Sequence, residues 1–229
     1  MGDMVEFKSN GGTGSGYLAS PTSRTGPGIL VIQEWWGLND QVKGKADMFA
    51  HDGFNALAPD LYHGQSAKFS EPDMAQKLMM ELDIQQAAKD VRGAARFLGS
   101  HEKTGSRKVG VIGFCMGGML ALMTGTVASE SIGAVVDCYG VPPRAKPEYA
   151  KMQGIPVLGI FGGKDEHVLQ ALPTLESDLA AAGVPFEKIV YPDADHAFLN
   201  DQRADVHRPG DANDAWPKIM AFLKRHLAS

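Results

Sequence analysis

Residues 108–118 read KVGVIGFCMGG, and the rest of the chain is interpreted from this stretch outward. Its first half is rich in β-branched residues and predicts a buried strand, and the apolar residues 120–122 predict a helix. Between them Gly113, Cys115 and Gly117 form the pattern G-x-C-x-G. Small residues two before and two after a sharp turn let strand and helix backbones approach, while the residue between them stands on a strained backbone. The stretch therefore predicts a nucleophile elbow that carries Cys115.

The chain has 229 residues, of which 44% are hydrophobic and 21% charged, and we expect one globular domain spanning residues 1–229. No apolar run reaches the roughly 18 residues of a membrane span, and residues 1–10 lack the apolar segment of a signal peptide. We therefore expect a cytoplasmic protein without a membrane partner. A net charge of −5 with scattered basic residues argues against nucleic acid. Two cysteines are too few for a disulfide scaffold or a zinc cluster, and we expect neither metal nor cofactor.

Strand-like and helix-like segments alternate along the chain. Apolar runs predict strands at 29–32, 54–58, 132–137, 155–161 and 186–191, besides the elbow strand; helical spacing predicts helices at 40–51, 72–98 with a break near Asp83, 169–182 and 212–227. Residues 5–20 predict a hairpin with a Gly-rich tip, and residues 141–147 a Pro-rich loop. Met74 and Met79 are expected in the core. The alternation predicts an α/β fold, with a mainly parallel sheet covered by helices on both faces.

Four reactive residues follow predicted strands. Glu34, Cys115, Asp165 and His196 each come shortly after an apolar run. Sites in open α/β sheets lie beyond the carboxyl ends of the strands, so these side chains are expected to meet. The order nucleophile, acid, histidine is the one that α/β-hydrolases use. We therefore predict a Cys115–His196–Asp165 triad within an α/β-hydrolase fold.

Each of these residues also has a purely structural interpretation. Cys115 alone could be an inert buried thiol, as Cys138 is expected to be, and Asp165 could simply form a turn. His196 competes with other histidines, and acidic residues stand next to it in the sequence. Neighbours one to three residues away rarely face the same ring nitrogen, so Asp193 and Asp195 are interpreted as loop residues.

The chemistry explains why these residue types are needed. A neighbouring imidazole can bring the pKa of a thiol, ordinarily about 8.5, to roughly 3.5–7.5. His196 would activate the thiol and then protonate the leaving alkoxide, while Asp165 would orient the imidazole. The backbone N–H groups of Met116 and Trp35 are the predicted oxyanion hole.

Over nearly its whole length the chain resembles the dienelactone hydrolases (carboxymethylenebutenolidases). The segments that carry the resemblance are QEWWG at 33–37, APDLY at 58–62, GFCMGG at 113–118, GGKD at 162–165, HAF at 196–198 and the last helix around Trp216. The resemblance implies a Cys-His-Asp triad that opens an enol-lactone. It also implies that Glu34 matches a glutamate that hydrogen-bonds the resting thiol and swings away when substrate binds.

The chain departs from this family at the site that would bind a substrate carboxylate. Members of the family use two arginines there, yet residues 65–82 contain none, and position 200, four residues after His196, is asparagine. Scattered lysines do not reproduce a bidentate guanidinium clamp. We therefore expect a neutral or aromatic ester or lactone as substrate. Trp36, Tyr62, Phe198 and Arg203 are the predicted pocket residues.

The sequence leaves other functions open. The preferred prediction is a hydrolase of small esters or lactones that works through an acyl-Cys115 intermediate, as a monomer or at most a weak dimer. An alternative is a redox or electrophile-sensing protein in which Cys115 is oxidised or alkylated and esterase activity is residual. A third is a non-catalytic binding protein that keeps the pocket.

Overall fold

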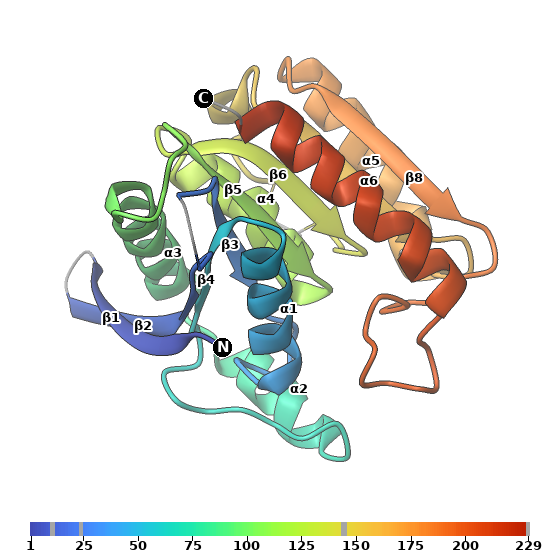
Figure 1. Cartoon of the computed structure of the whole chain (residues 1–229). Coiled ribbons are helices and arrows are strands. Elements are labelled where there is room, and N and C mark those ends of the chain that lie inside the picture. Colours follow the sequence, from blue (N-terminus) through green and yellow to red (C-terminus); the bar gives the residue numbers. More distant parts are fainter. Residues whose placement is uncertain (10–11, 23–24, 143–145, 228–229) are drawn as a thin grey trace.

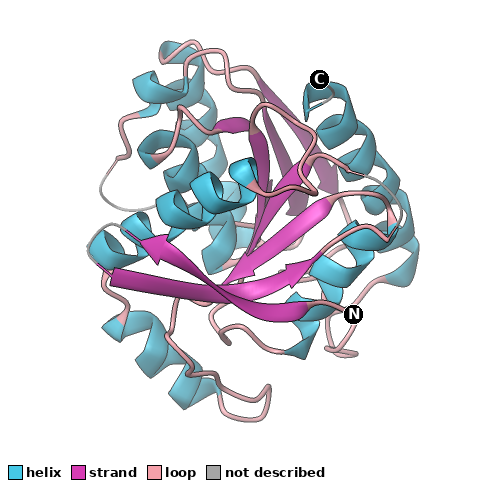
Figure 2. Cartoon of the chain, turned by 60° about the vertical axis from the view of Figure 1, so that its left-hand side comes forward, coloured by secondary structure: helices cyan, strands magenta, loops and turns pink. Residues whose placement is uncertain are grey.

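The structure is a computed structural model that describes residues 1–9, 12–22, 25–142 and 146–227. One sheet of eight strands runs through it, with helices packed against both sides (Figures 1 and 2). The strands are β1 Asp3–Ser9, β2 Gly12–Ala19, β3 Gly28–Ile32, β4 Asn55–Pro59, β5 Val109–Phe114, β6 Ile132–Cys138, β7 Val157–Gly162 and β8 Phe186–Tyr191. The helices are α1 Asp40–His51, α2 Pro72–Glu81, α3 Ile84–Ser100, α4 Met116–Val127, α5 Glu166–Ala181 and α6 Pro209–Leu227, with a 3₁₀ turn at Tyr149–Met152.

The strand order across the sheet is β1-β2-β4-β3-β5-β6-β7-β8. The β1–β2 hairpin and the β2–β4 pair are antiparallel, and every other neighbouring pair is parallel. Every residue of β3, β4 and β5 is buried, as expected for parallel strands that helices cover on both faces. The predicted mainly parallel α/β architecture is therefore confirmed.

Two apolar cores lie on the two faces of the sheet. Buried side chains of α1 and α6 belong to one core, and those of α2, α3, α4 and α5 belong to the other (Figure 2). Alternate residues of β5 serve both cores, since Val111 belongs to one and Ile112 to the other. The elbow that follows β5 is thus anchored by a strand packed on both sides.

The helix boundaries follow local capping. Asp83 separates α2 from α3, because its Oδ1 accepts from the N–H groups of Gln85 (2.9 Å) and Gln86 (3.1 Å). This confirms the predicted break. The expectation that Met74 and Met79 are core residues was wrong: they are 46% and 39% exposed, because α2 buries only one narrow face, through Ala75 and Leu78.

The hairpin predicted at residues 5–20 is confirmed in β1 and β2. Part of its Gly-rich tip lies outside the described residues, and so does the middle of the Pro-rich loop predicted at 141–147. α5 and α6 each begin three residues earlier than predicted. Among the described helices, none is both long enough and apolar enough to cross a membrane.

Candidate active site

Four predicted site residues lie at the same edge of the sheet. Glu34 follows β3, Cys115 follows β5, Asp165 follows β7 and His196 follows β8. These strands run parallel, so their carboxyl ends point to one edge, and the loops that leave them meet there. The sheet therefore gathers residues from positions 34 to 196 into one region.

Cys115 stands on the elbow in a conformation that side chains rarely adopt. Its φ is 56° and its ψ is −121°, and it occupies the position before the first residue of α4. The glycines on either side explain how the turn closes: a Cβ on Gly113 would come 1.8 Å from the carbonyl oxygen of Gly117, and a Cβ on Gly117 would come 2.4 Å from that of Gln33. Cys115, on this strained turn, is partly exposed.

His196 joins the thiol to a buried carboxylate. Its Nδ1 lies 2.5 Å from Oδ2 of Asp165, so Nε2 is the ring nitrogen left for Cys115. Burial lowers the pKa of His196, but its hydrogen bonds to Asp165 and to the Cys115 thiol outweigh burial and raise it to about 10. Asp165 is only 7% exposed, and its other oxygen accepts from the Val168 N–H (3.3 Å), which caps α5. One aspartate thus begins a helix and orients the imidazole.

Glu34 differs from what the resemblance implies. Its side chain is 2% exposed, and its Oε2 accepts a hydrogen bond from Nδ2 of Asn200 (3.0 Å). In the described part of the chain no hydrogen bond joins Glu34 to Cys115, whose thiol is paired with His196. Burial raises the pKa of Glu34, while Asn200 and then the positive charge of His196 lower it.

One tyrosine contacts both residues whose N–H groups are the predicted oxyanion donors. The hydroxyl of Tyr62 donates to the Trp35 carbonyl (3.1 Å) and lies 3.5 Å from the sulfur of Met116. Burial, and then the nearby Cys115, raise the pKa of Tyr62, so the hydroxyl stays protonated and able to donate. Within the described residues, neither the Trp35 nor the Met116 backbone N–H has an acceptor in the protein.

The predicted pocket residues take different positions. Tyr62 and Trp36 are 5% and 3% exposed, and the Trp36 ring packs edge-on against Trp35. Phe198 is fully buried between the rings of Tyr139 and Tyr191, so its side chain supports the His196 loop and does not form an open pocket wall. The guanidinium of Arg203 pairs with Asp205.

Two residues that sequence reasoning did not single out as site residues lie against the site. Tyr139, with a φ of 46°, packs its ring edge-on against His196 with 5.2 Å between ring centres. Asn200 reaches Glu34. A position directly after a strand end could have indicated Tyr139, but no local signal indicates that Asn200 faces Glu34, 166 residues away.

Cys138 is a core residue whose backbone lies next to that of Cys115. It is 0% exposed, and burial raises the pKa of its thiol well above the ordinary value, so it remains protonated. Its carbonyl accepts the Cys115 N–H (3.0 Å). A protonated and inaccessible thiol is a poor partner for resolving an oxidised cysteine.

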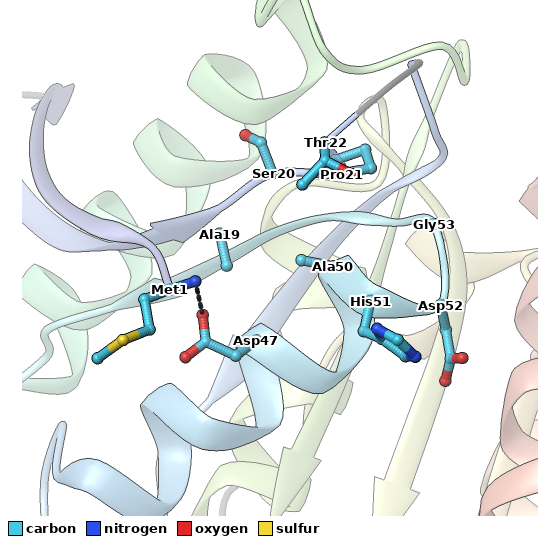
Figure 3. A pocket seen from close by; sticks show the side chains of 10 residues that line it. All are labelled: Met1, Ala19, Ser20, Pro21, Thr22, Asp47, Ala50, His51, Asp52 and Gly53. Atoms are coloured by element: carbon cyan, nitrogen blue, oxygen red, sulfur yellow. Dashed lines mark ion pairs between the residues drawn. The ribbon is translucent and has the colours of Figure 1, made fainter.

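A pocket lies away from these residues. A pocket of about 460 Å³ opens where α1 ends and β4 begins, near the amino ends of the parallel strands (Figure 3). It is lined by Met1, Ala19, Ser20, Pro21, Thr22, Asp47, Ala50, His51, Asp52 and Gly53. Cys115, Asp165 and His196 lie at the carboxyl ends of the strands, so this pocket is separate from them.

Known proteins resemble this chain along nearly all of its length. The model of the dienelactone hydrolase family matches residues 15–227. The chain is 38% identical to the protein named usf of Aquifex pyrophilus, over 99% of this chain and 100% of that protein. It is 35% identical, over the same shares, to a protein of Aquifex aeolicus provisionally named a carboxymethylenebutenolidase.

A solved structure agrees with these relatives. The crystal structure of a protein from Klebsiella pneumoniae, provisionally named a dienelactone hydrolase, has a TM-score of 0.84 and 26% identity, covering 98% of this chain and 99% of that one. The chain belongs to the dienelactone hydrolase family.

Proposed function

We propose that Cys115, His196 and Asp165 form a triad that cleaves a small neutral ester or lactone through an acyl-cysteine intermediate. Membership of the family makes the chain a hydrolase that acts on ester bonds. The observation that carries the proposal is the strained Cys115 at the start of α4, paired with an imidazole whose far nitrogen lies 2.5 Å from a buried carboxylate.

The first half of the reaction transfers the acyl group. The Cys115 thiolate attacks the carbonyl carbon and forms a carbon–sulfur bond, and the carbonyl electron pair moves to oxygen. When that pair returns, the carbon–oxygen bond breaks, and Nε2 of protonated His196 gives its proton to the leaving alkoxide. In a lactone the ring opens and the alcohol stays attached to the acyl group. Asp165 stabilises the imidazolium before this transfer.

The second half releases the acid. Neutral His196 removes a proton from water, the hydroxide attacks the thioester carbon, and the carbon–sulfur bond breaks to restore the thiolate and the imidazolium. In both halves the negative oxygen faces the N–H groups of Met116 and Trp35, two residues that the Tyr62 hydroxyl contacts through the Trp35 carbonyl and the Met116 sulfur. One such donor typically contributes roughly 3–4 kcal/mol to the transition state.

The charges around the site favour an uncharged substrate. Arg203 is the first arginine after His196, and its guanidinium already pairs with Asp205. Glu34, when ionised, would repel a substrate carboxylate. The aromatic rings of Trp35, Trp36 and Phe69 pack together close to the elbow, which suits an apolar or aromatic acyl or alcohol group.

The proposal is tested by ester turnover in two variants. Cys115→Ala and His196→Ala should each lose nearly all hydrolysis of p-nitrophenyl acetate. Cys138→Ala, which removes the other thiol of the chain, is the matched control and should keep the wild-type rate. Wild-type turnover in either triad variant would remove that residue from the mechanism.

A further inference from the structure

The chain that leaves β6 touches both the proposed nucleophile and the proposed base. The carbonyl of Cys138, the last residue of β6, accepts the N–H of Cys115 (3.0 Å). The next residue, Tyr139, packs its ring edge-on against the imidazole of His196, with 5.2 Å between ring centres and 63° between ring planes. Two consecutive residues thus contact the two groups between which the proposed mechanism moves a proton.

The backbone of Tyr139 turns in a way that brings its ring to this place. Its φ is 46°, in the left-handed region that residues with a side chain seldom adopt and that persists only where the surrounding structure enforces it. Successive residues of a strand face opposite sides of a sheet, yet Cys138 and Tyr139 both belong to the core that contains α1 and α6. The N–H of Tyr139 donates to the carbonyl of Ile160 in β7 (2.8 Å), which fastens the turn to the neighbouring strand.

The Tyr139 ring is held in place by further packing. It is 0% exposed, and it also lies against the rings of Phe114 and Phe198, with 6.3 Å and 5.9 Å between ring centres. Burial, and then the nearby Glu34, raise the pKa of Tyr139 well above its ordinary value, so its hydroxyl stays protonated and can donate to Glu34. The ring and the hydroxyl therefore have different neighbours, His196 and Glu34, and their roles can be separated.

His196 needs a constraint besides Asp165. The contact between its Nδ1 and Oδ2 of Asp165 (2.5 Å) fixes one atom of the imidazole, but a ring held at one atom can still turn about that contact. The side chain of His196 is 39% exposed, so protein atoms cover only part of it. Proton transfer requires Nε2 to face Cys115 within hydrogen-bond reach. The Tyr139 ring lies against the imidazole and restricts its rotation.

We propose that the aromatic ring of Tyr139 is a positioning group that holds the plane of the His196 imidazole, so that Nε2 faces the Cys115 thiol. This inference rests on the proposed function, because it takes His196 as the base. It goes beyond the triad by giving a role to the ring of Tyr139 and not to its hydroxyl. Because the ring acts on proton transfer and not on substrate binding, its loss should lower kcat and leave KM unchanged.

The test compares two variants in the hydrolysis of p-nitrophenyl acetate. Tyr139→Phe keeps the ring and removes the hydroxyl, and its kcat should stay within about twofold of wild type. Tyr139→Leu removes the ring, and its kcat should fall about tenfold, the size expected for the loss of one aromatic pair, while KM stays within about twofold. If Tyr139→Leu does not fold, Tyr139→Met, which is also unbranched and without a ring, carries the same expectation.

A second measurement does not depend on turnover. In protein with isotope-labelled histidine, NMR gives the rate at which the Nδ1 proton of His196, shared with Asp165, exchanges with water. The exchange should be about tenfold faster in Tyr139→Leu than in wild type and unchanged in Tyr139→Phe. The matched control is Phe49→Leu, which removes a fully buried ring from the same core, where it packs against Phe54 and Trp216; both its kcat and its exchange rate should match wild type.

Four results would overturn the inference. They are an unchanged kcat in Tyr139→Leu, a Tyr139→Phe variant as slow as Tyr139→Leu, a rise in KM without a fall in kcat, and an equal fall in kcat in Phe49→Leu. Full esterase activity in Cys115→Ala or His196→Ala would refute the proposed function instead. The proton-exchange comparison would still show whether the Tyr139 ring holds the imidazole.

Discussion

Asp137, at the end of β6, is a buried carboxyl in the first layer behind the elbow. It is 0% exposed; its Oδ1 accepts from the Gly140 N–H (2.8 Å), and within the described residues its Oδ2 has no partner. Burial raises its pKa from an ordinary 3.8 to about 7, although the Gly140 hydrogen bond opposes the shift. The folded protein therefore holds a proton that the unfolded chain releases between about pH 4 and pH 7.

The sign and the size of the effect follow by linkage. Where the folded state binds more protons than the unfolded state, the free energy of unfolding decreases as pH rises. Each pKa unit corresponds to about 1.4 kcal/mol, so between pH 5 and pH 8 wild type should lose about 2.5 kcal/mol through this residue. Asn at this position keeps the acceptor for Gly140 and cannot ionise. Any effect of the substitution itself on the free energy of unfolding is the same at pH 5 and at pH 8.

The assay is urea unfolding of wild type and Asp137→Asn at pH 5, 6, 7 and 8. The stability of the variant relative to wild type should rise by about 2.5 kcal/mol across this range, which for a chain of this size is roughly 5–10 °C in Tm. Asp3→Asn, at an exposed position in β1, is the control and should leave the pH dependence unchanged. Parallel curves for wild type and Asp137→Asn would refute the reasoning, because they would mean that Asp137 binds no extra proton in the folded state.

Three further predictions concern the site and its elbow. Asp165→Asn keeps the acceptor for the Val168 N–H but loses the negative charge that faces His196. We expect kcat/KM to fall at least about a hundredfold, while Tm, measured by calorimetry, hardly changes. A large fall in Tm together with the loss of activity would contradict this prediction. Because the pKa of His196 is raised to about 10, kcat/KM should fall as the pH rises through about 10, where the imidazolium loses the proton that the leaving alkoxide needs. A fall in kcat/KM already near pH 7 would show that the thiolate–imidazolium pair does not form. Gly117→Ala places a Cβ 2.4 Å from the Gln33 carbonyl oxygen and should lower the free energy of unfolding, measured in urea, by about 1–3 kcal/mol. Gly44→Ala, at a position in α1 with no atom within 4 Å of the new Cβ, should raise it by about 0.5–1 kcal/mol. Equal effects of the two substitutions would refute the close-packing explanation.

The meeting of the three proposed triad residues could be predicted because it depends mainly on the order and direction of the strands. Each of the three residues, Cys115, Asp165 and His196, follows a strand. The carboxyl ends of parallel strands lie at one edge of the sheet, and this holds for any conformation of the connecting loops. The break at Asp83 was predictable for a similar reason, since a cap acts within three residues.

The parts that could not be predicted depend on contacts between distant loops. The partner of Glu34 is 166 residues away, and nothing near Asn200 in the sequence marks it as a donor to a buried carboxyl. Phe198 was expected in the pocket, but the loop turns at Ala197, where φ is 64°, and its ring enters the core. The early start of α5 reflects the role of Asp165 as a helix cap, which is additional to its proposed part in the triad.

The central claim, that Cys115 carries the acyl group, is tested most directly by rapid quenching during turnover of p-nitrophenyl acetate, followed by peptide mass spectrometry. We expect an acetyl group on Cys115 that appears at the rate of p-nitrophenol release and disappears once the ester is consumed. Full turnover with no acetyl group on Cys115, or with the group on another side chain, would contradict it.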